Sequence, residues 1–251
     1  MKRLILFIGV FGIMAKAIAF NPTALIKEAN DDYKKNKFEQ AIQKYQTIND
    51  SGYVSAELYF NLGNAYYKTN NFKSAILYYE RAKLLKPDDK DIDFNLEMAR
   101  SFTVDKIEAI QEVFFISWIK WIRNLMSVES WTKSGVVLFI ISLVSFLLYL
   151  LSGKIGLKKA GFWIGVVTLI ISIASLSMGY QLKHLQMAKN TAIIFTPSVT
   201  LKSSPDESGT NLFILHEGTK VEILDKVGDW RWIKIANGSR GWIKMLDMVT
   251  I

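Results

Sequence analysis

The chain has 251 residues, of which 50% are hydrophobic, and a mean hydropathy of +0.17. That length allows one or two compact domains, and that hydropathy requires a search for membrane segments. Cysteine is absent, which excludes disulfide frameworks, thiolate metal sites and cysteine nucleophiles. The two histidines, His184 and His216, lie far apart in sequence, so we expect no histidine-rich metal site and no cofactor.

The net charge of +8 is concentrated beside apolar segments. Three of the excess positive charges lie in residues 1–19 and three lie in residues 135–182. Residues 20–134 carry equal numbers of acidic and basic side chains. Nucleic-acid binding requires a basic surface that neutralises phosphates, so nucleic acid is excluded as a partner.

Residues 1–19 have the pattern of a signal peptide. Lys2 and Arg3 precede an apolar run over residues 4–15, and the sequence Ala17-Ile18-Ala19 fits the small-x-small rule for cleavage. The alternative is an uncleaved anchor, but Lys16 interrupts the run and leaves it short for spanning a membrane. We therefore expect export of the region that follows.

Two uncharged apolar segments, residues 134–151 and 160–182, are long enough to cross a membrane. The loop between them, residues 152–159, holds three lysines, and the positive-inside rule places it in the cytoplasm. Both flanking regions then face the opposite side, in agreement with the signal peptide. The sequence thus predicts an inner-membrane hairpin whose N-terminal and C-terminal regions are both periplasmic. Because the spans lack central charged groups, a transporter or channel is not expected.

Small residues follow one face of the second span at alternating steps of four and three, which allows another helix to approach closely. They are Gly161, Gly165, Thr168, Ser172, Ser175 and Gly179. Two partners remain open for this face. One is the chain's own first span, where Gly135, Ser142 and Ser145 share a face, and the other is a helix of another protein.

Residues 20–102 contain segments that repeat at a period of 34. Tyr33, Phe38, Ala41, Ile42 and Tyr45 recur as Tyr67, Phe72, Ala75, Ile76 and Tyr79, and Phe60-Asn61-Leu62 recurs as Phe94-Asn95-Leu96. This period, with small and aromatic residues at fixed offsets, is typical of tetratricopeptide repeats. The segment 56–89 carries all eight signature positions of that family: Tyr59, Leu62, Gly63, Tyr66, Ala75, Tyr79, Ala82 and Pro87. We expect an array with repeats at 22–55 and 56–89 and a capping helix at 90–102.

Resemblance to this family implies a groove, lined by the first helix of each pair, that binds peptides or protein surfaces. The residues expected to face the groove are Lys27, Asn30, Lys34, Asn61, Asn64, Lys68 and Asn95. Asn30 and Asn61 match the family's carboxylate clamp, whereas Ile26, Asp91 and Asn95 replace its cationic members, so capture of a free carboxylate is not expected. The amides would hold an extended peptide backbone. The alternative is that these residues form an ordinary solvated helix face.

Residues 103–133 form an amphipathic, tryptophan-rich linker. One helical face of it is apolar, with Phe114, Phe115, Trp118, Trp121, Ile122 and Leu125. Tryptophan and cationic residues next to a span suit the bilayer interface, so we expect an interfacial helix on the outer leaflet. The alternative is a helix packed against the last repeat.

Residues 190–251 change to short β-rich runs separated by turn signals such as Asn237-Gly238. Six such runs favour a small all-β barrel. The order Val199-x-Leu201-x-Ser203-x-Pro205, Leu215-x-x-Gly218, Gly228-Asp229-Trp230 and Gly241-Trp242-Ile243 resembles bacterial SH3 domains. The resemblance implies binding of peptidoglycan or of another protein. Trp230 and Trp242 are expected in the core and at the rim of the barrel, the alternative being a ligand platform.

The order of these elements over the full length resembles the BatE-like tetratricopeptide members of the Bacteroides aerotolerance (Bat) family. The residues that carry the resemblance are Tyr59 to Pro87 and the helix Asn95-Leu96-Glu97-Met98-Ala99-Arg100. It implies an inner-membrane complex with von Willebrand A-domain membrane proteins, linked to oxygen tolerance or envelope stress. Because the chain carries no redox or metal motif, we expect a scaffold and not an enzyme, with an envelope sensor or peptidoglycan anchor as the alternative.

The fold class expected from the sequence is therefore a multidomain membrane protein. It comprises an α-helical tetratricopeptide solenoid, two transmembrane helices that contact the lipid bilayer, and a small all-β SH3-like barrel.

Overall fold

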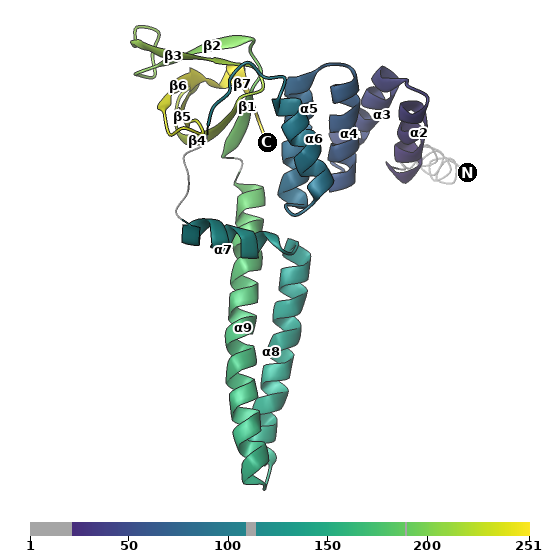
Figure 1. Cartoon of the computed structure of the whole chain (residues 1–251), viewed down its shortest axis with the longest axis vertical. Helices are drawn as coiled ribbons and strands as arrows, with labels where there is room; N and C mark the ends of the chain where they lie inside the picture. The colour runs from purple at the N-terminus through teal and green to yellow at the C-terminus, as the bar shows by residue number, and fades with distance from the viewer. Residues whose placement is uncertain (1–21, 109–113, 189) are drawn as a thin grey trace, which may run out of the picture. The chain divides into compact units, whose positions relative to one another are not determined.

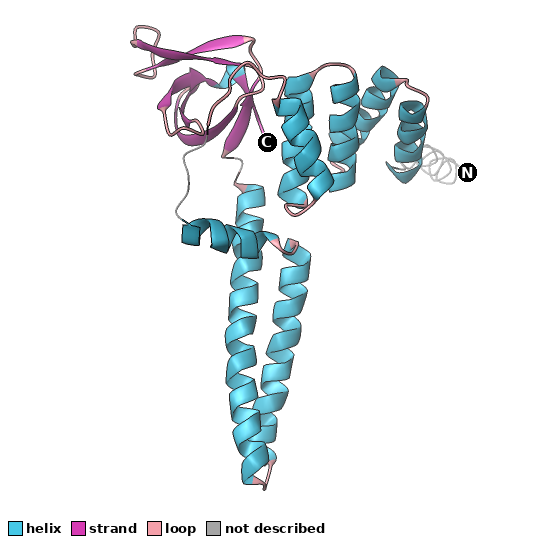
Figure 2. Ribbon diagram, viewed as in Figure 1, coloured by secondary structure: helices cyan, strands magenta, loops and turns pink. Residues whose placement is uncertain are grey.

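The computed structural model describes residues 22–108, 114–188 and 190–251 (Figure 1). The signal peptide expected at residues 1–19 lies outside the described residues. The chain divides into two units, of which the first ends at Tyr53 and the second begins at Val54. In the described part of the chain, the elements up to Met187 are helices, and strands with one short 3-10 turn follow (Figure 2).

The first unit contains the helices α2 (Pro22–Lys34) and α3 (Phe38–Asp50). The small residues Ala29 and Ala41 are fully buried between them, which allows the two helices to lie close together. Asn36, in the connecting turn, has a φ of 58°. Asparagine tolerates this left-handed conformation better than most residues do, and here it allows the chain to reverse.

The second unit begins with α4 (Ala56–Lys68), α5 (Phe72–Leu85) and α6 (Lys90–Arg100). A polar side chain caps the N-terminus of each helix: Ser55, Asn71 and Asp89 accept hydrogen bonds from backbone N–H groups of the first turn. Asn70 has a φ of 61° and lies 34 residues after Asn36, so the repeat reproduces its turn as well as its helices.

Close packing of α4 on α5 depends on Gly63. A Cβ atom at this position would lie 2.6 Å from the ring of Tyr79, which is itself buried. Residues 74–80 of α5 are buried without interruption, whereas a surface helix buries one face only. Both sides of α5 are therefore covered.

The helices α8 (Val128–Leu151) and α9 (Ile155–Met187) lie side by side (Figure 1). Both are long and apolar enough to cross a membrane, and only 17% and 22% of their most apolar windows are buried. A core helix of a soluble protein would be mostly buried, so these two helices are compatible with a membrane anchor. The start of α8 and both ends of α9 extend beyond the expected spans, and α9 begins inside the lysine-rich loop. The shorter α7 (Phe114–Asn124) precedes them.

The C-terminal region forms an antiparallel seven-stranded sheet with the order β3-β2-β6-β5-β4-β1-β7 (Figure 2). The strands are β1 (Thr191–Ile194), β2 (Ser198–Lys202), β3 (Asn211–His216), β4 (Lys220–Val227), β5 (Trp230–Lys234), β6 (Arg240–Lys244) and β7 (Met248–Thr250). The short β7, which follows a 3-10 turn at Met245–Asp247, was not among the six expected strands.

The barrel core is built from aliphatic side chains and Met248, including the fully buried Ile194, Leu201, Ile233 and Ile243. Trp230 and Trp242 are half-buried and lie outside this core cluster, which agrees with the expected position at the rim of the barrel and not with one in its core. The pleat explains the difference. Ile233 and Ile243 point inward, and side chains at adjacent positions of a strand point to the opposite face.

Candidate functional site

Helices α4 and α6, with the turn that follows α6, present a mixed face of amides and apolar side chains, which we call the α4–α6 face. Its residues are Asn61, Asn64, Lys68, Phe94, Asn95, Met98 and Phe102. The hydroxyl of Tyr79 on α5 donates a hydrogen bond of 2.7 Å to Oδ1 of Asn64, and Nδ2 of Asn95 lies 3.5 Å from the same oxygen. Asn64 is therefore held by the repeat's own core, while Lys68 is exposed.

The apolar part of the α4–α6 face was missed by the sequence analysis. Phe94 is 65% exposed, Met98 is 40% exposed and Phe102 is 54% exposed, and they follow one another at steps of four. Phe94 and Met98 lie four residues apart on one face of α6, and Phe102 follows in the turn after the helix ends, so the three form an apolar strip beside the amides. Phe94 repeats Phe60 at the period of 34, a recurrence that is visible in the sequence.

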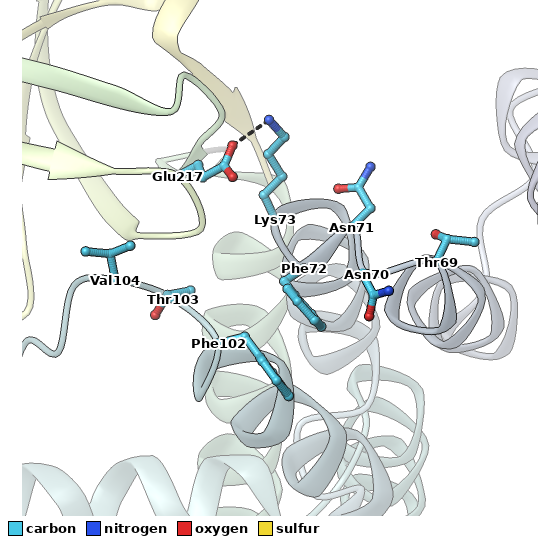
Figure 3. Close-up of a pocket in the computed structure, with 9 residues that line it drawn as sticks. All are labelled: Thr69, Asn70, Asn71, Phe72, Lys73, Phe102, Thr103, Val104 and Glu217. Carbon is cyan, nitrogen blue, oxygen red and sulfur yellow. Dashed lines mark hydrogen bonds and ion pairs between the residues drawn. The ribbon is translucent and has the colours of Figure 1, made fainter.

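One end of this face contains stacked aromatic rings and a pocket. The rings of Phe72 and Phe102 are stacked with centroids 4.3 Å apart, and Tyr67 meets both of them edge-on. Beside them lies a pocket of about 330 Å³, which Lys73 and Glu217 also line (Figure 3). Nζ of Lys73 lies 2.6 Å from Oε2 of Glu217 and donates a second hydrogen bond to the carbonyl oxygen of Phe195.

The other side of α5 is covered by the barrel. Besides Lys73, Arg81 reaches across and donates a hydrogen bond of 2.8 Å to the carbonyl oxygen of Thr250. A Cβ atom at Gly218 would lie 3.3 Å from Cδ1 of Ile76, so the side chain of Ile76 packs directly against this turn of the barrel. This side of α5 is therefore not available to a partner of the repeat.

The most buried charge of this contact is Glu80, whose side chain is 3% exposed. It forms ion pairs with Arg100 of α6 and with Lys220 of β4, whose Nζ lies 2.7 Å from Oε2. Burial alone would raise the pKa of Glu80, but Lys220 and Arg100 outweigh it and hold the pKa below its ordinary value. Glu80 thus remains ionised and joins two repeat helices to the barrel.

The segment after α6 also fastens to the barrel. Asp105 accepts hydrogen bonds of 2.7 Å from the backbone N–H of His216 and from the hydroxyl of Thr219, and Nδ1 of His216 lies 2.8 Å from it. Burial would raise the pKa of Asp105, but these hydrogen bonds keep it below its ordinary value. Two residues later, Ile107 packs against the barrel core.

In the first unit, Lys27, Asn30 and Lys34 lie on α2. The hydroxyl of Tyr45 donates a hydrogen bond to Oδ1 of Asn30, as Tyr79 does to Asn64. The two lysines are exposed. The recurrence at equivalent positions gives these asparagines a role inside the repeat, in addition to any contact with a partner.

The small-residue stripe of α9 lies against α8. Five of its six residues are buried, and Thr168 is half-buried and hydrogen-bonded within its own helix. The hydroxyl of Ser142 donates to the carbonyl oxygen of Gly165, at 2.9 Å, and that of Ser172 donates to the carbonyl oxygen of Gly135, at 2.8 Å. Of the two partners left open by the sequence, the structure places the chain's own first span on this stripe.

Helix α7 exposes most of its apolar side chains, including Phe114, Phe115, Trp118 and Trp121. It contacts α9, and the indole N–H of Trp131 on α8 donates a hydrogen bond of 2.9 Å to the carbonyl oxygen of Arg123. This bond ties α7 to the start of the first candidate span. Among the described residues, no group of three or more histidine, cysteine or acidic residues could hold a metal ion.

Comparison with known families matches two parts of the chain. Residues 56–89 match the tetratricopeptide repeat family, and residues 197–246 match the bacterial SH3 domain family. A search of curated proteins found no match to this chain. Together with the two apolar helices, these matches confirm the expected fold class. They support a protein-interaction scaffold with a domain type suited to the cell wall, and both families are typically non-catalytic.

Proposed function

We propose that the chain is a membrane-anchored periplasmic scaffold that binds a protein partner on its α4–α6 face. One observation carries this proposal. Phe94, Met98 and Phe102 form an exposed apolar strip beside a row of amides, while the opposite side of the repeat is occupied by the barrel. Exposed contiguous apolar surface on a folded domain is typical of an interaction site.

The contact between repeat and barrel supports the proposed topology. The two regions flank the pair of apolar helices in sequence, and they can touch only when both lie on the same side of a membrane. The lysine-rich loop then lies in the cytoplasm, and α7 lies on the outer leaflet of the inner membrane. Resemblance to the Bat family supports von Willebrand A-domain membrane proteins as partners, in an aerotolerance or envelope-stress complex.

The test is affinity purification from detergent-solubilised membranes followed by mass spectrometry. The intact protein is compared with a Phe94→Ala/Met98→Ala variant and with Leu246→Ala, a control that is 89% exposed on the barrel. We expect a stoichiometric partner with the intact protein and the control, and its loss with the double variant. Retention of the partner by the double variant would move the contact to the spans or the barrel.

The choice of substitutions follows from the structure. Asn30 and Asn64 each accept a hydrogen bond from a core tyrosine, so replacing them by alanine would also disturb the repeat. Phe94 and Met98 are exposed, so their removal tests binding with little effect on folding.

A second candidate function concerns the barrel alone, which would anchor the chain to the cell wall. The observation that favours it is a group of tryptophans on the outer face of the sheet.

A further inference from the structure

Three tryptophans occupy one outward face of the barrel sheet, which we call the tryptophan face. Trp232 on β5 is paired with Trp242 on β6, and their ring centroids lie 5.3 Å apart. Trp230 is paired with Lys244, whose ammonium group lies 5.6 Å from the ring centroid. All three rings are half-buried and lie outside the core cluster.

Cations surround Trp242 on three sides. Lys202 on β2 lies directly opposite Trp242 in the sheet. Arg240 and Lys244 lie two residues before and two residues after Trp242, on the same face of β6. Lys244 is neutralised by Glu207. Among the described residues, no ion pair joins Lys202 or Arg240 to a carboxylate. Nζ of Lys202 donates to the backbone oxygen of Glu207, at 3.2 Å, and the pKa of the Glu207 carboxyl is lowered mainly by Lys244, with a smaller contribution from Lys202.

This arrangement selects among ligand classes. A purely apolar partner would remove Lys202 and Arg240 from water without replacing their hydrogen bonds, which is costly. A ligand with flat apolar faces, polar edges and negative charge would stack on the rings and satisfy both cations. A chain of pyranose rings that carries carboxylates has all three properties.

We infer that the tryptophan face binds an acidic glycan, with sugar rings stacked on Trp232 and Trp242 and a carboxylate held by Lys202 and Arg240. The inference gives the second candidate function a surface and a ligand class. It is independent of partner binding on the α4–α6 face, because the two surfaces share no residue.

The experiment uses the full chain in nanodiscs and three probes. The first is peptidoglycan glycan strands freed of their peptides by an amidase, which carry lactyl carboxylates. The second is chitotetraose, which is neutral, and the third is vesicles of an anionic phospholipid. The variants are Trp232→Ala/Trp242→Ala, Trp232→Phe/Trp242→Phe and Lys202→Ala/Arg240→Ala, with Lys226→Ala and Leu246→Ala as exposed controls on the same domain.

The intact protein should bind the acidic strands more tightly than chitotetraose. The double alanine variant of the tryptophans should lose about tenfold or more in affinity, and the phenylalanine variant should keep most of it. Loss of Lys202 and Arg240 should weaken binding about fivefold at low salt and have little effect at high salt. Phe94→Ala/Met98→Ala should bind like the intact protein, which separates this result from a failure of partner binding.

Three results would overturn the inference. They are acidic strands bound equally by the intact protein and by the tryptophan-to-alanine variant, chitotetraose bound as tightly as the acidic strands, and binding of the intact protein to the vesicles alone.

Discussion

Replacing Lys220 by methionine should loosen the barrel from α5. In the intact protein, Nζ of Lys220 lies 2.7 Å from a carboxylate whose side chain is 3% exposed, while Lys220 itself is 37% exposed. Removing one partner of a buried ion pair costs about 3–5 kcal/mol, because the remaining charge is left desolvated. Since Arg100 still pairs with Glu80, we expect about 2–3 kcal/mol, which is about a 30- to 150-fold increase in the undocked population.

Lys234→Met is a closely matched control. Nζ of Lys234 lies 3.0 Å from Glu222, and the lysine is 38% exposed, but Glu222 is 42% exposed. Exposed pairs contribute about 0–1 kcal/mol, so this variant should change undocking less than about fivefold. The two lysines thus differ mainly in the burial of their partner.

The assay uses the natural absence of cysteine. An Ile76→Cys substitution places a single thiol on α5 beside Gly218, and its rate of labelling reports the population in which the barrel has moved away. Equal labelling rates for Lys220→Met and Lys234→Met would refute the reasoning that burial of Glu80 controls docking. A Glu80→Gln/Lys220→Met variant should recover part of the loss, because it leaves no unpaired buried charge.

The remaining predictions concern pH, topology and helix packing. The folded-state pKa of Glu80 lies below its ordinary value of 4.5. Its contribution to docking should therefore be complete above about pH 4.5 and lost as the pH falls through the folded-state pKa. Thiol labelling of the Ile76→Cys protein should show this pH dependence, and labelling of the same protein with Glu80→Gln should not. In spheroplasts, a membrane-impermeant maleimide should label Lys68→Cys and Lys226→Cys but not Lys158→Cys, and the opposite pattern would invert the topology. Gly161→Ala should lower the thermal midpoint in detergent at a cost of about 1–3 kcal/mol, because its Cβ would lie 2.7 Å from the carbonyl oxygen of Ser145. Gly156→Ala, with no atom within 4 Å, should not lower it, and equal effects of the two substitutions would contradict close packing of α8 on α9.

Local patterns in the sequence were sufficient to predict the helices and most of the strands. The period of 34 reflects a physical unit: Gly63 must be small to admit Tyr79, and Asn36 and Asn70 close equivalent turns. The small residues of α9 similarly indicate a close helix contact by their spacing alone, and two hydrogen bonds between α8 and α9 lie along that face. Such positions are constrained by neighbours only a few turns away, and the sequence shows that constraint directly.

The positions that the sequence did not reveal depend on distant contacts. Lys220 follows Glu80 by 140 residues, and nothing in either neighbourhood predicts that they meet. Phe94 was visible as the recurrence of Phe60, but the interior explains most aromatic residues of a repeat, so its exposure could not be inferred. For Trp230 and Trp242 the sequence could not separate a core position from a rim position, and only the strand register places them outside the core.

The covered side of α5 decides how the molecule can work. Repeat helices offer two sides to partners, and here Lys73, Glu80 and Arg81 connect one of them to the barrel. The buried pair of Glu80 and Lys220 opposes separation of the barrel from α5. A protein partner on the α4–α6 face and a glycan on the tryptophan face would therefore be bound by repeat and barrel domains that stay docked to each other. Undocking by Lys220→Met should then leave both binding affinities intact, and a pull-down of the protein partner on immobilised glycan strands should still succeed, because α7, α8 and α9 keep the repeat and the barrel in one chain. Loss of the pull-down with Lys220→Met would instead show that docking itself completes one of the two binding surfaces.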